Sequence, residues 1–156
     1  MKKVIILLFL VSLIYANDKA DIENLINRHW ESWNLKKYKD YISSVHSGGT
    51  KNGDSNGSFW YVMTPTVKGL TENRKPGDKS SFNARYIDVD VLVPGEAALA
   101  YYYLVGSFTL NGISKSDYRT RLVKYLLRKK ESGKSKVDIS RRCIAEVVFL
   151  INFEID

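Results

Sequence analysis

Apolar residues recur at intervals of three and four positions in the N-terminal third of the chain. Across residues 18–35 this spacing is typical of an amphipathic helix with one buried face, capped by Asn17 or Asp18. After a tight corner near Asn34, the same period continues in a second helix that ends at Gly48. The periodic positions are Ile22, Leu25, Ile26, Trp30 and Trp33, followed by Tyr38, Tyr41, Ile42 and Val45.

The pattern changes in the middle of the chain. Residues 50–57 are polar and rich in glycine, which predicts a loop. Residues 58–64 are apolar and aromatic and predict a short strand that Pro65 ends. Residues 66–77 are less regular and predict a helical turn.

Long β segments follow at 81–93, 97–110 and 115–130, each closed by a pair of turn residues. Consecutive hairpin junctions predict an antiparallel meander. The alternation in the first segment slips near Tyr86 and Ile87, which indicates a β-bulge that bends the sheet. Two helices followed by a curved antiparallel sheet make an α+β fold with the helices on one side. The turn pairs are Pro94-Gly95, Asn111-Gly112 and Ser132-Gly133.

The first residues have the pattern of a secretory signal peptide. Lys2 and Lys3 precede an apolar run over residues 4–15. This run is shorter than the roughly 20 apolar residues of a spanning helix, although an uncleaved anchor is the alternative. We expect cleavage after Ala16, a secreted or periplasmic product without a stable membrane anchor, and a single domain over residues 17–156.

The net charge of the chain gives little support to a nucleic-acid-binding function. The net charge is +7, of which two charges belong to the predicted signal peptide, so the cleaved chain carries 7 − 2 = +5. No nucleic-acid motif accompanies this mild basicity.

Cys143 is the only cysteine, which excludes an intrachain disulfide and favours a small buried residue on a strand. The chain has two histidines, His29 and His46, and neither zinc spacing nor a P-loop, so we expect no metal and no cofactor.

Four motifs occur in a characteristic order: H-W-E-S-W-N at 29–34, V-P-G-E-A-A-L-A-Y-Y-Y at 93–103, Y-R-T-R-L at 118–122 and E-S-G-K at 131–134. In this order they resemble the NTF2-like superfamily, in particular its SnoaL-like and kinase-association-type members. The resemblance implies a cone in which a curved sheet wraps around a long helix and leaves an apolar pocket. It also implies homodimers through the outer face of the sheet, which the apolar residues on both faces of segment 97–110 favour as well.

The resemblance ends near Lys136. Residues 137–156 diverge from the family pattern, although alternating residues from Val147 to Ile155 still suit a last strand. A tail from a shifted reading frame is the alternative.

The candidate pocket residues are large aromatics and cations. The tryptophans either fill the core or line a pocket, and Trp60 is the better pocket candidate. Arg121 matches an arginine that enters the pocket of association-type members, and its alternative role is an ion pair with Asp88 or Asp90 on a solvated strand face. The expected pocket set is Trp30, Trp60, His46, Arg119 and Arg121.

These features predict an exported pocket domain that binds a small apolar or anionic ligand or mediates assembly. The alternative is a small isomerase or dehydratase that uses His46 or an aspartate as general base. The position of the polar groups distinguishes them: a histidine or carboxylate inside the pocket beside a tyrosine favours an enzyme, and an arginine alone favours a binder.

Overall fold

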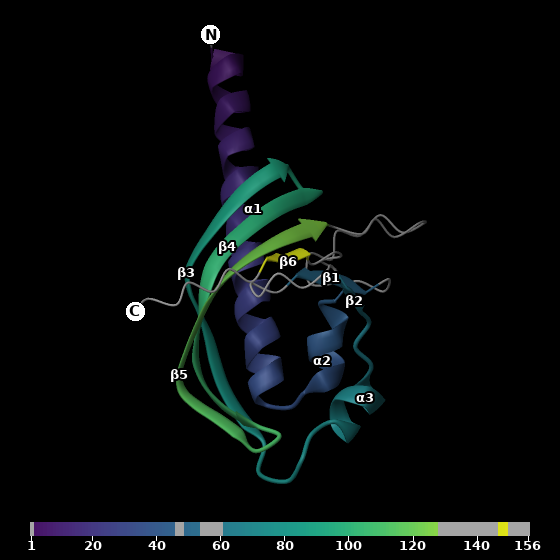
Figure 1. Ribbon diagram of the computed structural model, residues 1–156. Coiled ribbons are helices and arrows are strands. Elements are labelled where there is room, and N and C mark those ends of the chain that lie inside the picture. The colour runs from purple at the N-terminus through teal and green to yellow at the C-terminus, as the bar shows by residue number, and fades with distance from the viewer. Residues whose placement is uncertain (1, 46–48, 54–60, 128–146, 150–156) are drawn as a thin grey trace.

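A strongly curved sheet wraps around one long helix (Figure 1). The computed structural model describes the backbone of residues 2–45, 49–53, 61–127 and 147–149, and the side chains of residues 17–45, 49–50 and 62–127. The elements are α1 (Lys2–Asn34), α2 (Tyr38–Ser43), β1 (Thr50–Gly53), β2 (Tyr61–Met63), α3 (Val67–Glu72), β3 (Lys79–Val93), β4 (Ala97–Leu110), β5 (Ile113–Leu127) and β6 (Val147–Phe149).

The main sheet confirms the predicted meander. Its order is β3-β4-β5 and both pairs are antiparallel. The predicted bulge is present, because the register between β3 and β4 shifts between Arg85 and Asp88. Tyr86 has a φ of 53° at this point. The extra residue returns the side chains that follow to the inner face, so Phe82 and Val89 are both buried although one has an even and the other an odd number.

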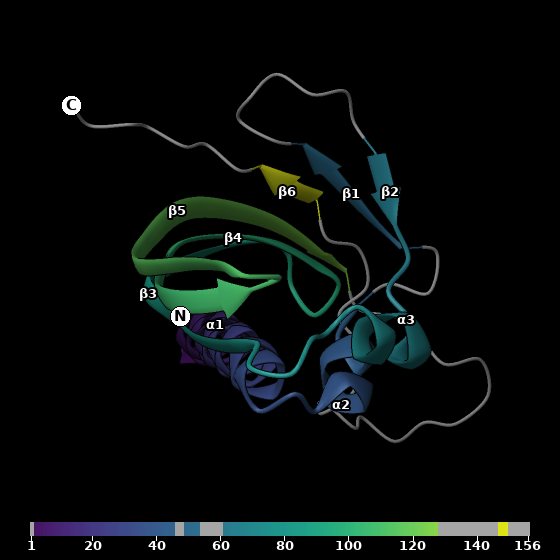
Figure 2. The same cartoon turned by 60° about the horizontal axis from the view of Figure 1, so that its bottom comes forward.

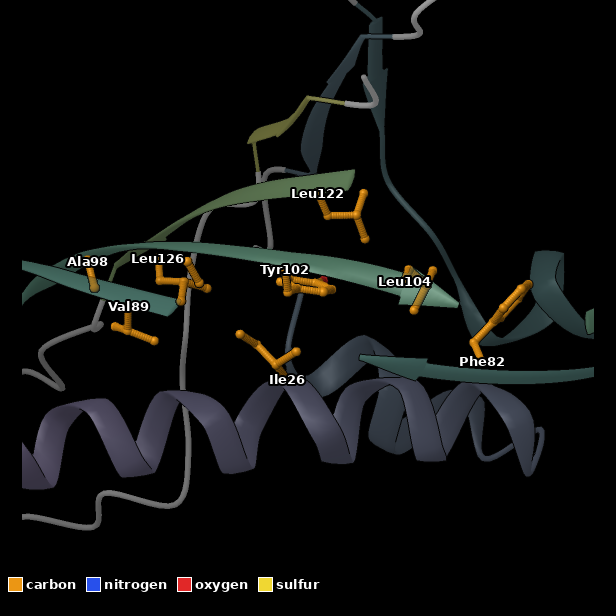
Figure 3. Close-up of a cluster of buried hydrophobic side chains, with 9 residues drawn as sticks. Ile26, Phe82, Val89, Ala98, Tyr102, Leu104, Leu122 and Leu126 are labelled. Atoms are coloured by element: carbon orange, nitrogen blue, oxygen red, sulfur yellow. The ribbon is translucent and has the colours of Figure 1, made fainter. Parts of the chain in front are cut away.

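The core lies between α1 and the concave face of this sheet. Ile26 projects from α1 toward the strands, and the side chains of β4 and β5 project back toward the helix (Figure 3). Burial of alternate residues on each strand is what the period of two predicts. The buried cluster comprises Ile26, Phe82, Val89, Ala98, Ala100, Tyr102, Leu104, Leu122 and Leu126.

A smaller sheet extends this wall beyond β5 (Figure 2). Its order is β2-β1-β6, with β1 antiparallel to β2 and parallel to β6. The prediction of a loop over residues 50–57 is therefore wrong for 50–53. This polar segment forms a strand because it has a backbone partner on each side, which its side chains do not reveal. Residues 147–149 fall in the predicted last strand, and Cys143 lies outside the described residues.

α1 continues without a break from the apolar N-terminal segment into the domain, so the expected cap at Asn17 or Asp18 is wrong. Its N-terminal half extends past the sheet (Figure 1). Over the part of the chain that the structure describes, none of the helices combines the length and apolarity of a bilayer-crossing segment. Signal cleavage and export stay predictions.

Two polar side chains attach α1 to opposite ends of β3. Asp18 Oδ2 accepts a hydrogen bond from the backbone N–H of Gly95, which follows β3, at 2.7 Å. Asn34 bonds both backbone groups of Phe82, donating to its carbonyl at 2.7 Å and accepting from its N–H at 2.8 Å. The Asn34 amide therefore takes the place of a neighbouring strand at this position of β3.

We predict that Asn34→Leu lowers the free energy of unfolding by about 1–3 kcal/mol, because both backbone groups of Phe82 lose their partner. Asn34→Asp is the matched control: its carboxylate still accepts from the N–H but cannot donate to the carbonyl, so its loss should be smaller. Urea denaturation at neutral pH measures both. A leucine variant as stable as the wild type would show that this contact does not hold the helix.

Candidate functional site

Trp30 carries a polar contact into the core. Its side chain extends from α1 toward β4, where the indole N–H donates to the hydroxyl of Tyr102 at 3.1 Å. Tyr102 is 3% exposed. The indole N–H of the half-buried Trp30 needs an acceptor, and the oxygen of the buried phenol supplies it.

Lys124 enters the same region from β5. Its side chain is only 4% exposed, and its ammonium lies 5.2 Å from the centre of the Trp30 ring and 5.9 Å from that of Tyr102. A buried cation is costly unless electron-rich groups surround it, and the two aromatic faces are among the groups that do so here. The interior therefore holds a positive charge beside two aromatic rings.

His29 lies one residue earlier on α1 and faces α2. Its ring is 5% exposed and lies 4.3 Å from the ring of Tyr41, tilted by 31°. His29 Nδ1 is 2.6 Å from Ser44 Oγ. It also meets the Trp30 ring edge to face at 5.1 Å, and this contact connects His29 with Tyr102 and Lys124 through Trp30.

The tautomer of His29 follows from the hydrogen bonds of Ser44. Ser44 Oγ lies 2.7 Å from the carbonyl oxygen of Tyr41, which can only accept, so the serine hydrogen points there. A hydroxyl has one hydrogen, and Ser44 must therefore accept from His29. The proton of the neutral imidazole is on Nδ1, and Nε2 carries the free lone pair.

Nε2 of His29 is buried and has no hydrogen-bond partner among the residues that the structure describes. Burial, and to a smaller extent the charge of Lys124, holds the pKa of His29 well below its usual value. The ring is therefore neutral at pH 7, and Nε2 can accept a proton or a hydrogen bond. We call His29, Trp30, Tyr41, Ser44, Tyr102 and Lys124 the inner polar cluster.

The predicted pocket residues lie in different places. Trp30 belongs to the inner polar cluster, whereas Trp60 and His46 lie outside the described residues. Arg119 and Arg121 are exposed and lie on the outer face of the sheet. The register explains this, because Thr120, Leu122 and Lys124 occupy the inner face of β5.

Arg119 and Arg121 have partners on that outer face. Arg119 forms a fork with the carboxylate of Asp117 at 2.9 and 3.0 Å. Arg121 lies over the ring of Tyr103, with Cζ 5.6 Å from its centre. Both line a groove on the side of the sheet opposite Trp30. Asp88 and Asp90 are exposed, as expected for a solvated face. The homodimer through this face stays a prediction.

Sequence reasoning missed Lys124, Tyr102 and the role of His29. A lysine is normally assigned to the solvent, but Lys124 stands between Leu122 and Leu126 on a strand where alternate residues share a face. The shared face with Leu122 and Leu126 was the feature of the sequence that indicated a buried Lys124. Ile26 comes four residues after Ile22, and His29 comes three residues after Ile26. This spacing places His29 at the edge of the apolar stripe of the helix.

Comparison with solved structures finds the same arrangement of elements. A putative scytalone dehydratase from Novosphingobium aromaticivorans superposes with a TM-score of 0.63 at 9% identity, over 89% of this chain and 87% of that one. An NTF2-like protein of unknown function from Pseudomonas putida gives 0.58 at 12% identity, over 85% and 86%. An uncharacterised protein with a cystatin-like fold from Caulobacter vibrioides gives 0.57 at 18% identity, over 86% and 91%.

The chain adopts the NTF2-like fold. No family model and no curated protein matches its sequence. At these identities the structural likeness establishes the fold alone, so the chemistry of this NTF2-like domain has to be inferred from its own side chains. Among its described residues, no three His, Cys, Asp or Glu side chains come close enough to hold a metal ion.

The lowered pKa of His29 predicts how stability depends on pH. The unfolded chain takes up a proton near the ordinary value of 6.5, whereas the folded chain resists it. The unfolded state therefore binds more protons below pH 6.5, and stability should fall as the pH drops from about 6.5 to 5. Thermal unfolding across this window measures the effect. His29→Gln should flatten the curve, and an unchanged slope in that variant would assign the effect to another group.

Proposed function

We propose that this NTF2-like domain binds a small aromatic or enolic molecule whose weakly acidic hydroxyl donates its hydrogen to His29 Nε2. One observation carries the proposal: the Ser44 bond fixes the proton on Nδ1 and leaves a buried lone pair on Nε2 without a partner among the described residues. A ligand hydroxyl is the complement of that lone pair.

The surroundings of His29 favour the same ligand class. The rings of Tyr41 and Trp30 contact His29 and offer flat apolar surfaces to an aromatic body. Lys124 lies near enough to lower the pKa of His29, and its ammonium would equally stabilise an anionic oxygen on the ligand. Since Nε2 is sealed from solvent, the ligand must displace a covering side chain or segment to reach it.

The probe is 4-nitrophenol, whose ionised form absorbs visible light. Titration of the full chain should give saturable binding with an increased phenolate fraction at a pH near the probe's own pKa. His29→Gln and Lys124→Met should each weaken binding roughly tenfold, the scale of one hydrogen bond to a charged group. Lys115→Met removes an exposed lysine of β5 and is the matched control.

Equal affinity in the wild type and in His29→Gln would overturn the proposal. Loss of binding in His46→Gln, with His29→Gln unaffected, would instead assign the acceptor to the histidine that the sequence pattern suggested. Circular dichroism of every variant separates a lost contact from a lost fold.

Proton-transfer catalysis, as in an isomerase or dehydratase, is the second candidate function. A histidine base inside the fold beside tyrosines favours it, whereas the candidate arginines are outside. Here Nε2 would remove a proton from carbon next to a carbonyl, and Lys124 with Tyr102 would stabilise the enolate oxygen.

Deuterium exchange tests this candidate. An aryl ketone such as acetophenone, incubated with the protein in D₂O, should take up deuterium at its methyl carbon at least tenfold faster with the wild type than with His29→Gln. Exchange equal to the buffer rate, combined with His29-dependent binding of nitrophenol, would identify a binder that does not catalyse this step.

A further inference from the structure

We propose a second ligand site, for an oxyanion such as a phosphate or carboxylate group, at the corner where α1, α2 and α3 meet (Figure 1). Four buried polar atoms at this corner have no hydrogen-bond partner among the described residues. They are both terminal nitrogens of Arg74, the indole nitrogen of Trp33 and the hydroxyl of Tyr38. This corner lies outside the inner polar cluster, and the inference does not rest on the proposed function.

The three side chains meet around the ring of Trp33. The guanidinium of Arg74, which lies just after α3, is over that ring with Cζ 4.4 Å from its centre. The ring of Tyr38, at the start of α2, meets it edge to face at 6.2 Å. Tyr38 is 7% exposed. The arginine fork therefore lies on the indole with its terminal nitrogens and the indole nitrogen buried, although Arg74 and Trp33 as whole residues are half-buried.

All four unpartnered atoms can donate, and those of Arg74 and Trp33 can do nothing else. A group that only accepts hydrogen bonds is the complement of such a set, and a negative charge also balances the guanidinium. Phosphate and carboxylate oxygens meet both requirements. A neutral apolar molecule would leave the four donors unpaired.

The acidic side chain of Asp78 does not fill this role. Asp78 is close enough for the charge of Arg74 to contribute to its lowered pKa, whose largest cause is the hydrogen bond from the backbone N–H of Lys75. Its Oδ2 accepts that bond at 3.0 Å, and its Oδ1 accepts from the N–H of Asn111 at 3.0 Å. Asp78 thus uses its oxygens to hold the start of β3, and no ion pair joins it to Arg74 in the described part of the chain.

Inorganic phosphate and acetate are the probes, each compared with chloride at equal ionic strength. We expect a saturable rise in the melting temperature of the full chain and a change in tryptophan fluorescence. Arg74→Gln should weaken the apparent affinity at least tenfold. Arg85→Gln, which removes an exposed arginine of β3, is the matched control and should behave as the wild type. The stronger of the two probes identifies the kind of oxyanion.

Phosphate also stabilises proteins by exclusion from their surfaces, so the decisive quantity is the difference between wild type and variant. An equal rise in the wild type and in Arg74→Gln would overturn the proposal, as would no saturable response to either probe. Should Arg74→Gln fail to fold, Tyr38→Phe removes one donor and keeps the ring. Affinity unchanged in that variant would then count as the overturning result.

Discussion

The attachment of α1 to both ends of β3 determines how the side chains of α1 lie relative to the sheet and to α2. Asp18, at the middle of α1, is bonded to Gly95, and Asn34, the last residue of α1, is bonded to Phe82. Between the two side chains α1 makes more than four turns, so both its position along β3 and its rotation are fixed. Hydrophobic burial is non-directional and restricts the rotation of the helix only as closely as the width of its apolar stripe. These hydrogen bonds make one orientation preferred.

The orientation of α1 separates its neighbouring residues by function. Ile26 and Trp30 face the sheet, where Trp30 reaches Tyr102, whereas His29 faces α2 and reaches Tyr41. A rotation by one residue, about 100°, would exchange these environments. The neutral imidazole of His29 and the buried ammonium of Lys124 are thus near each other because these hydrogen bonds hold the helix in place, not because either group is favourable in the core.

Much of the fold could be predicted, because turn residues mark the ends of the strands and the alternation of apolar and polar residues marks the bulge. The strand Thr50–Gly53 could not, since its partner β6 lies almost a hundred residues later and the side chains T-K-N-G carry no β signal. It was harder still to predict which face of β5 points toward the core. Arg121 shares its face with Val123 and Lys124 shares its face with Leu122, so apolar neighbours alone do not say which cation is buried. Only the packing of Leu122 and Leu126 against the helix decides it.

Lys124 connects the stability of the empty domain with its capacity to accept a proton. Burial, and to a smaller extent repulsion from the Lys124 ammonium, disfavours a protonated His29, so the imidazole stays neutral. A ligand that gives its hydrogen to Nε2 becomes an anion at the same moment, and that anion attracts both cations. The transfer therefore offsets the repulsion from Lys124, which is the smaller of the two effects that keep His29 neutral, and the new ion pair compensates part of the larger one, the cost of a buried charge. A neutral ligand without an acidic hydrogen cannot do this, and the inner polar cluster would select against it.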